Sequence, residues 1–180
     1  TSYMNEYITR IADNALEVSQ VLRQASTARK NAVLRALAER LRDNREELKT
    51  ENARDIAYAR EIGLETSMLD RLTLSDKVID SMANAALEIA AFNDPVGEVV
   101  EGHTLKSGVR LSKLRTPLGV VALIYESRPN VTIDVGALCL KSGNAAILRG
   151  GKEAIHSNRM LVKLFQSALV GSEEHTSERV

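Results

Sequence analysis

The sequence of 180 residues is poor in cysteine, and Cys139 is its only one. A single cysteine excludes an internal disulfide framework, which is how many small secreted domains are stabilised. The first residues, TSYMNEYITRIADNAL, carry charges throughout and contain no apolar segment of signal-peptide length. Both observations predict a cytoplasmic protein in a reducing compartment.

An excess of charge of one sign is also absent, because 24 Lys and Arg residues balance 24 Asp and Glu residues. Nucleic-acid and acidic-membrane binders usually carry a basic field, so neither kind of partner is expected. The longest run of apolar residues and glycine, LGVVALIY at 118–125, is too short to cross a bilayer. We therefore expect a soluble chain whose recognition depends on local groups.

The first half of the sequence predicts amphipathic helices that serve as scaffold. One apolar stripe contains Leu34, Leu37, Ala38 and Leu41. Asn44, followed three positions later by Glu47, resembles a capping box and predicts a helix that ends near Gly63. Another helix is expected after Ser75 and before a turn at 93–97.

The second half predicts an α/β fold. β-branched residues and glycines predict a hairpin at about 96–116, with its turn near 106–108. A βαβα unit follows, with strands at 118–125 and 144–149 and helices at 131–143 and 153–169. This order predicts a parallel pair with a right-handed crossover, and the apolar runs predict a first strand buried on both faces and a second buried strand.

The carboxyl ends of the two parallel strands are where ligands of such sheets gather. The first end reads YESRPNVT and the second reads RGGKEA. The Gly-x-Gly-x-x-Gly turn and the acidic residue of the usual NAD site are missing there. Arg149 and Lys152, with Gly150 and Gly151 between them, instead predict a site for the ribose phosphate of NADP. The alternative is an ordinary turn whose two cations lie in water.

Residues 116–154, TPLGVVALIYESRPNVTIDVGALCLKSGNAAILRGGKEA, resemble the γ-glutamyl phosphate reductase family of the aldehyde dehydrogenase superfamily. The likeness extends through the helical first half and ends near residue 169. It implies a Rossmann-type cofactor domain that is incomplete, preceded by N-terminal helices and a β-hairpin. It also implies reduction of L-glutamate 5-phosphate by NADPH to L-glutamate 5-semialdehyde and phosphate, in proline synthesis, by a homo-oligomer whose hairpin joins a neighbouring subunit.

The resemblance also implies roles for single residues. Arg149 stands where many relatives have a lysine that touches the cofactor ribose, and Lys152 stands near a glutamate of the NAD-dependent ones. Asn130 is the candidate for the side chain that stabilises the oxyanion. Ser127 and Arg128 are candidates for binding the substrate phosphate or carboxylate, and stabilisation of the loop is the alternative. No metal is expected.

The nucleophilic cysteine of the family has no counterpart in this sequence. Cys139 lies between two leucines of a predicted buried helix, where a cysteine is more often an inert apolar residue. We therefore expect a chain without the catalytic domain, inactive by itself. Whether the parent protein is a separate reductase or is fused to a glutamate kinase stays open, as does its oligomeric state.

Residues 170–180, VGSEEHTSERV, lose both the helical periodicity and the likeness to the family. They are expected to be an artefact of the reading frame or a disordered polar tail. Two other functions are kept for the whole chain, namely a helical interaction module and a nucleotide-binding module without redox activity.

Overall fold

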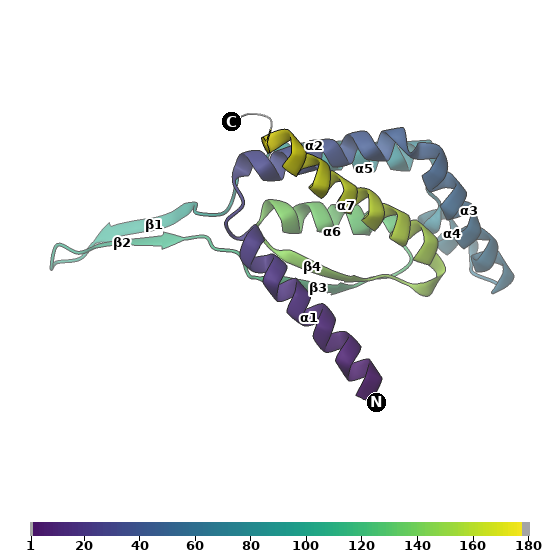
Figure 1. Cartoon of the computed structure of the whole chain (residues 1–180), viewed down its shortest axis with the longest axis horizontal. Helices are drawn as coiled ribbons and strands as arrows, with labels where there is room; N and C mark the ends of the chain where they lie inside the picture. Colours follow the sequence, from purple (N-terminus) through teal and green to yellow (C-terminus); the bar gives the residue numbers. More distant parts are fainter. Residues whose placement is uncertain (1, 178–180) are drawn as a thin grey trace.

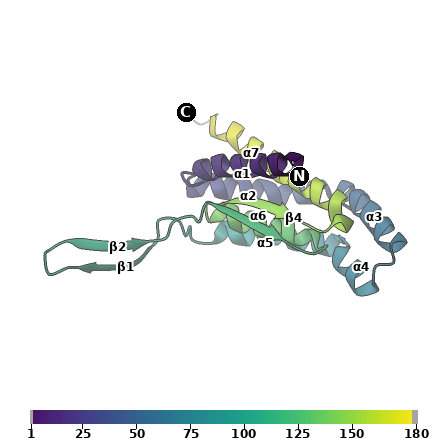
Figure 2. The ribbon, with the colours of Figure 1, turned by 90° about the horizontal axis from the view of Figure 1, so that it is seen from below.

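The computed structural model describes the backbone of residues 2–177 and the side chains of residues 3–171. Its elements follow in the order α1 (Ser2–Leu22), α2 (Thr27–Asp43), α3 (Arg45–Glu61), α4 (Thr66–Leu72), α5 (Asp76–Ala91), β1 (Val99–Thr104), β2 (Arg110–Leu114), β3 (Val120–Ile124), α6 (Pro129–Lys141), β4 (Ala145–Arg149), a 3₁₀ turn η1 (Lys152–Ala154) and α7 (Ile155–Ser177). The hairpin β1–β2 extends away from the rest of the chain, and α3 and α4 lie at the opposite end (Figure 1, Figure 2).

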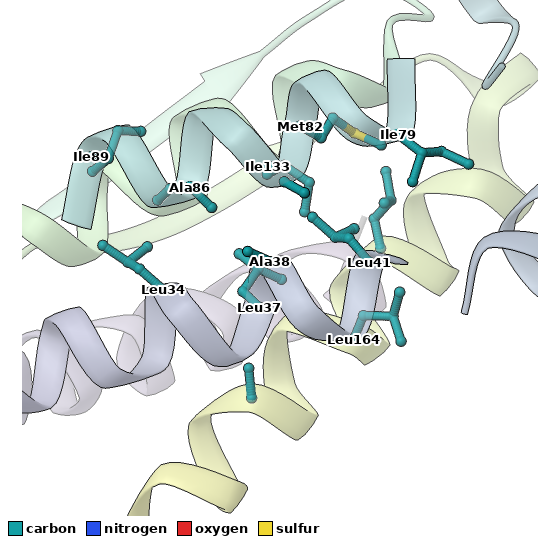
Figure 3. Packing of buried hydrophobic residues seen from close by; sticks show 14 of the residues in the cluster. Leu34, Leu37, Ala38, Leu41, Ile79, Met82, Ala86, Ile89, Ile133 and Leu164 are labelled. Carbon is teal, nitrogen blue, oxygen red and sulfur yellow. The ribbon is translucent and has the colours of Figure 1, made fainter. Parts of the chain in front are cut away.

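The main core lies where α2, α5, α6 and α7 pack together (Figure 3). The predicted stripe of α2 is fully buried there, and Ile79 and Met82 of α5 face it together with Ile133 of α6. Burying one such side chain stabilises the fold by roughly 1.5–3 kcal/mol. The amphipathic pattern therefore predicted the packed face of α2 correctly.

Local signals at the helix ends are confirmed in part. The Ser75 hydroxyl accepts a hydrogen bond from the Val78 N–H, and Gly63 ends α3 with φ +74°. The capping box at Asn44 is wrong, although α3 does begin at the next residue. Asn44 also closes α2, and its side-chain amide donates to the Arg40 carbonyl oxygen, so it does not cap α3.

The predicted hairpin is present, and its two antiparallel strands pair Thr104 with Arg110 next to the turn. Gly108 adopts φ +85° in that turn, a conformation that favours glycine. Every residue of both strands is exposed. The hairpin therefore contributes nothing to the core of this chain.

β3 and β4 form the predicted parallel pair, in a register that joins Val120 to Ala145 and Ile124 to Arg149. The prediction that the first strand is buried on both faces is wrong, because Ile124 is 84% exposed, and the second strand is only partly buried, since Ala146 is exposed. In the described part of the chain the two strands pair only with each other, and of the two it is β4 that has more contact with α1 and α6.

The last helix runs further than its periodicity predicted. We expected it to end near Leu169, whereas the backbone stays helical to Ser177. Residues 178–180 lie outside the described part of the chain. That 170–180 form a tail foreign to the family stays a prediction.

Candidate functional site

Two loops meet at the carboxyl edge of the small parallel sheet. Because β3 and β4 run in the same direction, the segments that follow them leave from one edge. The Tyr125 N–H donates to the Arg149 carbonyl oxygen at 3.0 Å and so continues the pairing one residue beyond β3. The loop at 125–128 and the turn at 150–154 therefore start side by side, at the end of the molecule that carries α3 and α4 (Figure 1).

A hydrogen bond between side chains links the two loops. The hydroxyl of Ser127, which is buried, donates to the Glu153 carboxylate at 2.7 Å. This donation lowers the pKa of Glu153, so the carboxylate is ionised at neutral pH. Ser127 thus has a partner within the chain, as the loop-stabilising alternative requires. Its predicted contact with substrate stays a prediction.

Gly150 and Gly151 lie in a turn where side chains of the neighbouring loop and of α7 approach closely. A Cβ atom at Gly150 would collide with the amide of Asn158 and approach the Tyr125 ring, and one at Gly151 would collide with the Ser127 hydroxyl. Neither glycine has a positive φ. The chain itself fills the space next to both residues, so their smallness serves the packing of the two loops.

The predicted cations lie at this edge with exposed side chains. Arg149 donates to the Gly150 carbonyl oxygen at 3.4 Å, and Lys152 begins the 3₁₀ turn. Arg128 is 3.9 Å from the carboxylate of Glu126, a weak pairing for a guanidinium. The edge therefore carries three exposed cationic side chains, from both loops, together with the carboxylates of Glu126 and Glu153.

Asn130 lies in the first turn of α6, which Pro129 begins. Its side-chain amide donates to the Asp134 carboxylate at 3.4 Å. Burial raises the pKa of Asp134, against the opposing effect of this hydrogen bond. The structure thus places Asn130 next to the β3 loop, where an oxyanion ligand was predicted, and shows one intramolecular partner for it.

A polar network behind the loops was missed at the level of sequence. The hydroxyls of Tyr125 and Thr132 share a hydrogen bond of 2.6 Å, and Thr132 donates to the side-chain oxygen of Asn158 at 3.1 Å. These three residues come from the β3 loop, α6 and α7. No local pattern connects them, since pairing of this kind depends on the tertiary fold.

Cys139 is buried in the last turns of α6, as predicted. Burial raises the pKa of its thiol, which disfavours the thiolate form that attacks carbonyl carbons. It lies ten residues along α6 from Pro129, the residue at which the helix begins next to the β3 loop. Among the described residues, no group of His, Cys, Asp and Glu side chains is placed to hold a metal ion.

The model of the aldehyde dehydrogenase family matches residues 2–173. The chain belongs to this family. It is 51% identical over 168 residues to the γ-glutamyl phosphate reductase of Leptospira interrogans serovar Lai, an alignment that covers 93% of this chain and 40% of that protein. The chain therefore spans about 40% of the length of the curated relatives that it matches.

Solved structures agree with this assignment. The γ-glutamyl phosphate reductase of Thermotoga maritima is 42% identical and superposes with a TM-score of 0.86, over 89% of this chain and 39% of that one. The yeast enzyme of the same name, from Saccharomyces cerevisiae, gives 34% identity and the same TM-score, over 93% of this chain and 43% of that one. The predicted fold, an incomplete aldehyde-dehydrogenase-like cofactor domain preceded by helices and a hairpin, is confirmed.

Over the residues that the structure describes, no helix of this family member has both the length and the apolar character that a membrane span needs.

Proposed function

We propose that this chain is the N-terminal portion of an enzyme that reduces L-glutamate 5-phosphate with NADPH to L-glutamate 5-semialdehyde and phosphate, in proline synthesis. The observation that carries the proposal is the 51% identity to a γ-glutamyl phosphate reductase across almost the whole chain. In this proposal residues 1–169 supply the N-terminal helices, the hairpin and the first βαβα part of the NADP domain. The catalytic domain comes from residues beyond this chain.

The turn after β4 is the proposed cofactor site, formed by Arg149, Gly150, Gly151 and Lys152. Two exposed cationic side chains, beside the nearby carboxylate of Glu153, support a site for the extra phosphate of NADPH. When bound, NADPH supplies the hydride for the reduction. Lys152 would hold the ribose phosphate, and Arg149 would contact the ribose.

The loop after β3 is the proposed substrate side of the site. The exposed guanidinium of Arg128 suits bidentate binding of a phosphate or a carboxylate. Ser127 would contribute its backbone while its hydroxyl stays with Glu153, and Asn130 would donate to the oxyanion of the reacting acyl group. Each of these three residues is anchored by the start of α6 or by the turn after β4.

The nucleophile of the proposed reaction is a thiolate outside this chain. It attacks the acyl phosphate, forms a thioester and releases phosphate. Cys139 does not serve, because its side chain is buried and its thiol pKa is raised. We therefore propose that the chain binds the cofactor without turning over substrate.

The exposed hairpin is the proposed contact with another subunit in a homo-oligomer. Its strands carry exposed apolar side chains at Val99, Val100, Leu111 and Leu114, and their outer edges are unpaired in the described chain. Open edges of this kind are usually covered in the native assembly.

Calorimetric titration of the purified chain with NADPH and NADH tests the proposal. We expect NADPH to bind more tightly, and we expect no change in NADPH absorbance when semialdehyde, phosphate and NADP are mixed with the chain. Equal binding of both cofactors would remove the assigned role of the cationic turn. Absence of binding would favour a helical interaction module, and turnover abolished by Cys139→Ser would refute the assignment of the nucleophile.

A further inference from the structure

The cationic turn leads directly into a helix whose N-terminus is capped by a residue from another helix. The first N–H groups of a helix have no partner within it. At the start of α7 the carboxylate of Asp55, in α3, accepts from the His156 N–H at 3.1 Å and the Ser157 N–H at 2.7 Å. It also accepts from the Ser157 hydroxyl at 2.7 Å. One acidic side chain thus satisfies three donors about a hundred residues away in the sequence.

The cap that Asp55 forms on α7 is buried, and its burial fixes the position of the helix start. Asp55 is only 1% exposed, and an ionised carboxylate in such a place needs donors to offset its lost hydration. The three donors supply them, and the positive end of the α7 dipole adds to the attraction. The beginning of α7 is therefore held at one place on α3.

Asn52, one turn before Asp55, extends the attachment to α4. Its side-chain amide donates to the Ser157 hydroxyl at 3.0 Å and to the Leu72 carbonyl oxygen at 2.8 Å. Its oxygen accepts from the Leu74 N–H at 2.8 Å. α3 therefore ties the start of α7 to the end of α4.

The 3₁₀ turn is seated on the same two helices by apolar contact. Ala154, its last residue, is fully buried and packs in a small cluster with Ala59 of α3 and Leu72 of α4. Lys152, its first residue, is exposed. The turn that carries Lys152 is thus fixed at one end by β4 and at the other end by α3 and α4.

From these contacts we propose that Asp55 is a positioning residue for the nucleotide site, an inference that rests on the proposed function. Asp55 touches neither cofactor nor substrate in this arrangement. It holds the turn at 150–154 so that the Lys152 ammonium stays where the ribose phosphate binds. Without the carboxylate, two N–H groups and a hydroxyl lose their acceptor, the start of α7 loosens, and the backbone that carries Lys152 loses its fixed position.

Two nucleotides that differ by one phosphate test this role on the full 180-residue chain. Adenosine 2′,5′-bisphosphate carries the phosphate that Lys152 would bind, and 5′-AMP lacks it. For Asp55→Ala we expect the preference for the bisphosphate, measured as a ratio of dissociation constants, to fall about tenfold. Asp55→Asn keeps one acceptor oxygen, so its ratio should lie between those of the wild type and Asp55→Ala.

Asp94→Asn is the matched control, because Asp94 is another carboxylate with three donors but lies in the segment before the hairpin. A general loss of stability would lower the ratio in this variant too, whereas the positioning role leaves it unchanged. Hydrogen exchange of the unliganded chain gives a second readout. Amides at 152–158 should exchange faster in either Asp55 variant, with no change in α2.

The outcomes separate the two proposals. A wild-type chain that binds both nucleotides equally would overturn the assigned NADPH site and the positioning role together. A wild-type chain that prefers the bisphosphate, with an unchanged ratio in both Asp55 variants, would overturn the positioning role alone. If Asp55→Ala fails to fold, the ratio and the hydrogen exchange of Asp55→Asn test the positioning role. Amides at 152–158 that are as protected in Asp55→Asn as in the wild type would then refute that role.

Discussion

Replacing Asp94 with alanine would break a buried ion pair that ties the base of the hairpin to the helices. The Lys30 ammonium lies 2.6 Å from the Asp94 carboxylate, and the Lys30 side chain is only 1% exposed. Asp94 also accepts from the Thr27 hydroxyl at 2.6 Å and from the Val96 N–H at 2.9 Å. In the variant, Lys30 keeps the Lys141 carbonyl oxygen as an acceptor but has no counter-charge.

The expected cost follows from the burial of the remaining charge. Breaking a buried ion pair by removing one partner typically costs about 3–5 kcal/mol. Asp94 keeps some contact with water, so we expect about 3 kcal/mol, the lower end of that range. A domain of this size is stable by roughly 5–15 kcal/mol in total, so the effect should be large in urea unfolding.

The pH dependence gives the same pair a second test. Burial alone raises the pKa of Asp94, but the hydrogen bonds from Lys30, Thr27 and the Val96 N–H outweigh it, and the net pKa is lowered. A lowered pKa in the folded state stabilises the fold above the unfolded pKa of about 3.9. This contribution is lost as the pH falls through the folded value. The wild type should therefore lose more stability below about pH 4 than Asp94→Ala does.

Asp80→Ala is the matched control, since Asp80 pairs with Arg45 at 2.6 Å on the surface. Exposed pairs contribute little, so this variant should unfold close to the wild-type midpoint. Equal shifts of the urea midpoint in Asp80→Ala and Asp94→Ala, with an unchanged dependence of the unfolding free energy on urea concentration, would refute the reasoning from burial.

Three further predictions concern the candidate site. Lys152→Glu should weaken NADPH binding about tenfold to a hundredfold and NADH binding far less, as measured by calorimetry, because a charge-assisted contact is lost and repulsion is added. Lys106→Glu, at the tip of the hairpin, is its control, and an equal loss would assign the effect to net charge. Gly151→Ala should cost about 1 kcal/mol in urea unfolding, since its Cβ would displace the Ser127 hydroxyl and the Glu153 carboxylate and break their hydrogen bond; wild-type stability would contradict this packing. Cys139 should react with a thiol reagent only after unfolding, and rapid reaction of the native chain would show an accessible thiolate.

Local patterns predicted those features that local contacts decide. The stripe of α2 is buried because an apolar repeat of helical period defines one face whatever the partner is. Ser75 caps α5 and Gly63 ends α3 because both effects act within one turn of helix. The parallel order of β3 and β4 also followed from the sequence, since a helix of this length between two strands favours a crossover.

Features that depend on distant residues were not predictable in the same way. The apolar residues of the strands predict burial, on both faces for the first strand, but burial depends on which elements cover them, and Ile124 stays 84% exposed. The Ser127 to Glu153 bond was also missed. Each residue alone resembles an ordinary loop residue, and only the parallel register brings the two loops together.

α3, a helix of the first half of the chain, helps to position the candidate site. Its sequence contains a signal for this role. Asn52 and Asp55 lie three positions apart, on the face of α3 that also buries Leu48 and Ala59. Burying a carboxylate on such a face is costly unless several donors meet it, and the free N–H groups at a helix start are the densest set of donors that a backbone offers. An acidic residue on a buried helical face therefore predicts a group of donors beside it, such as a cationic side chain or the start of another helix. In this chain that helix is α7, so the position of the cationic turn depends on α3 as well as on β4.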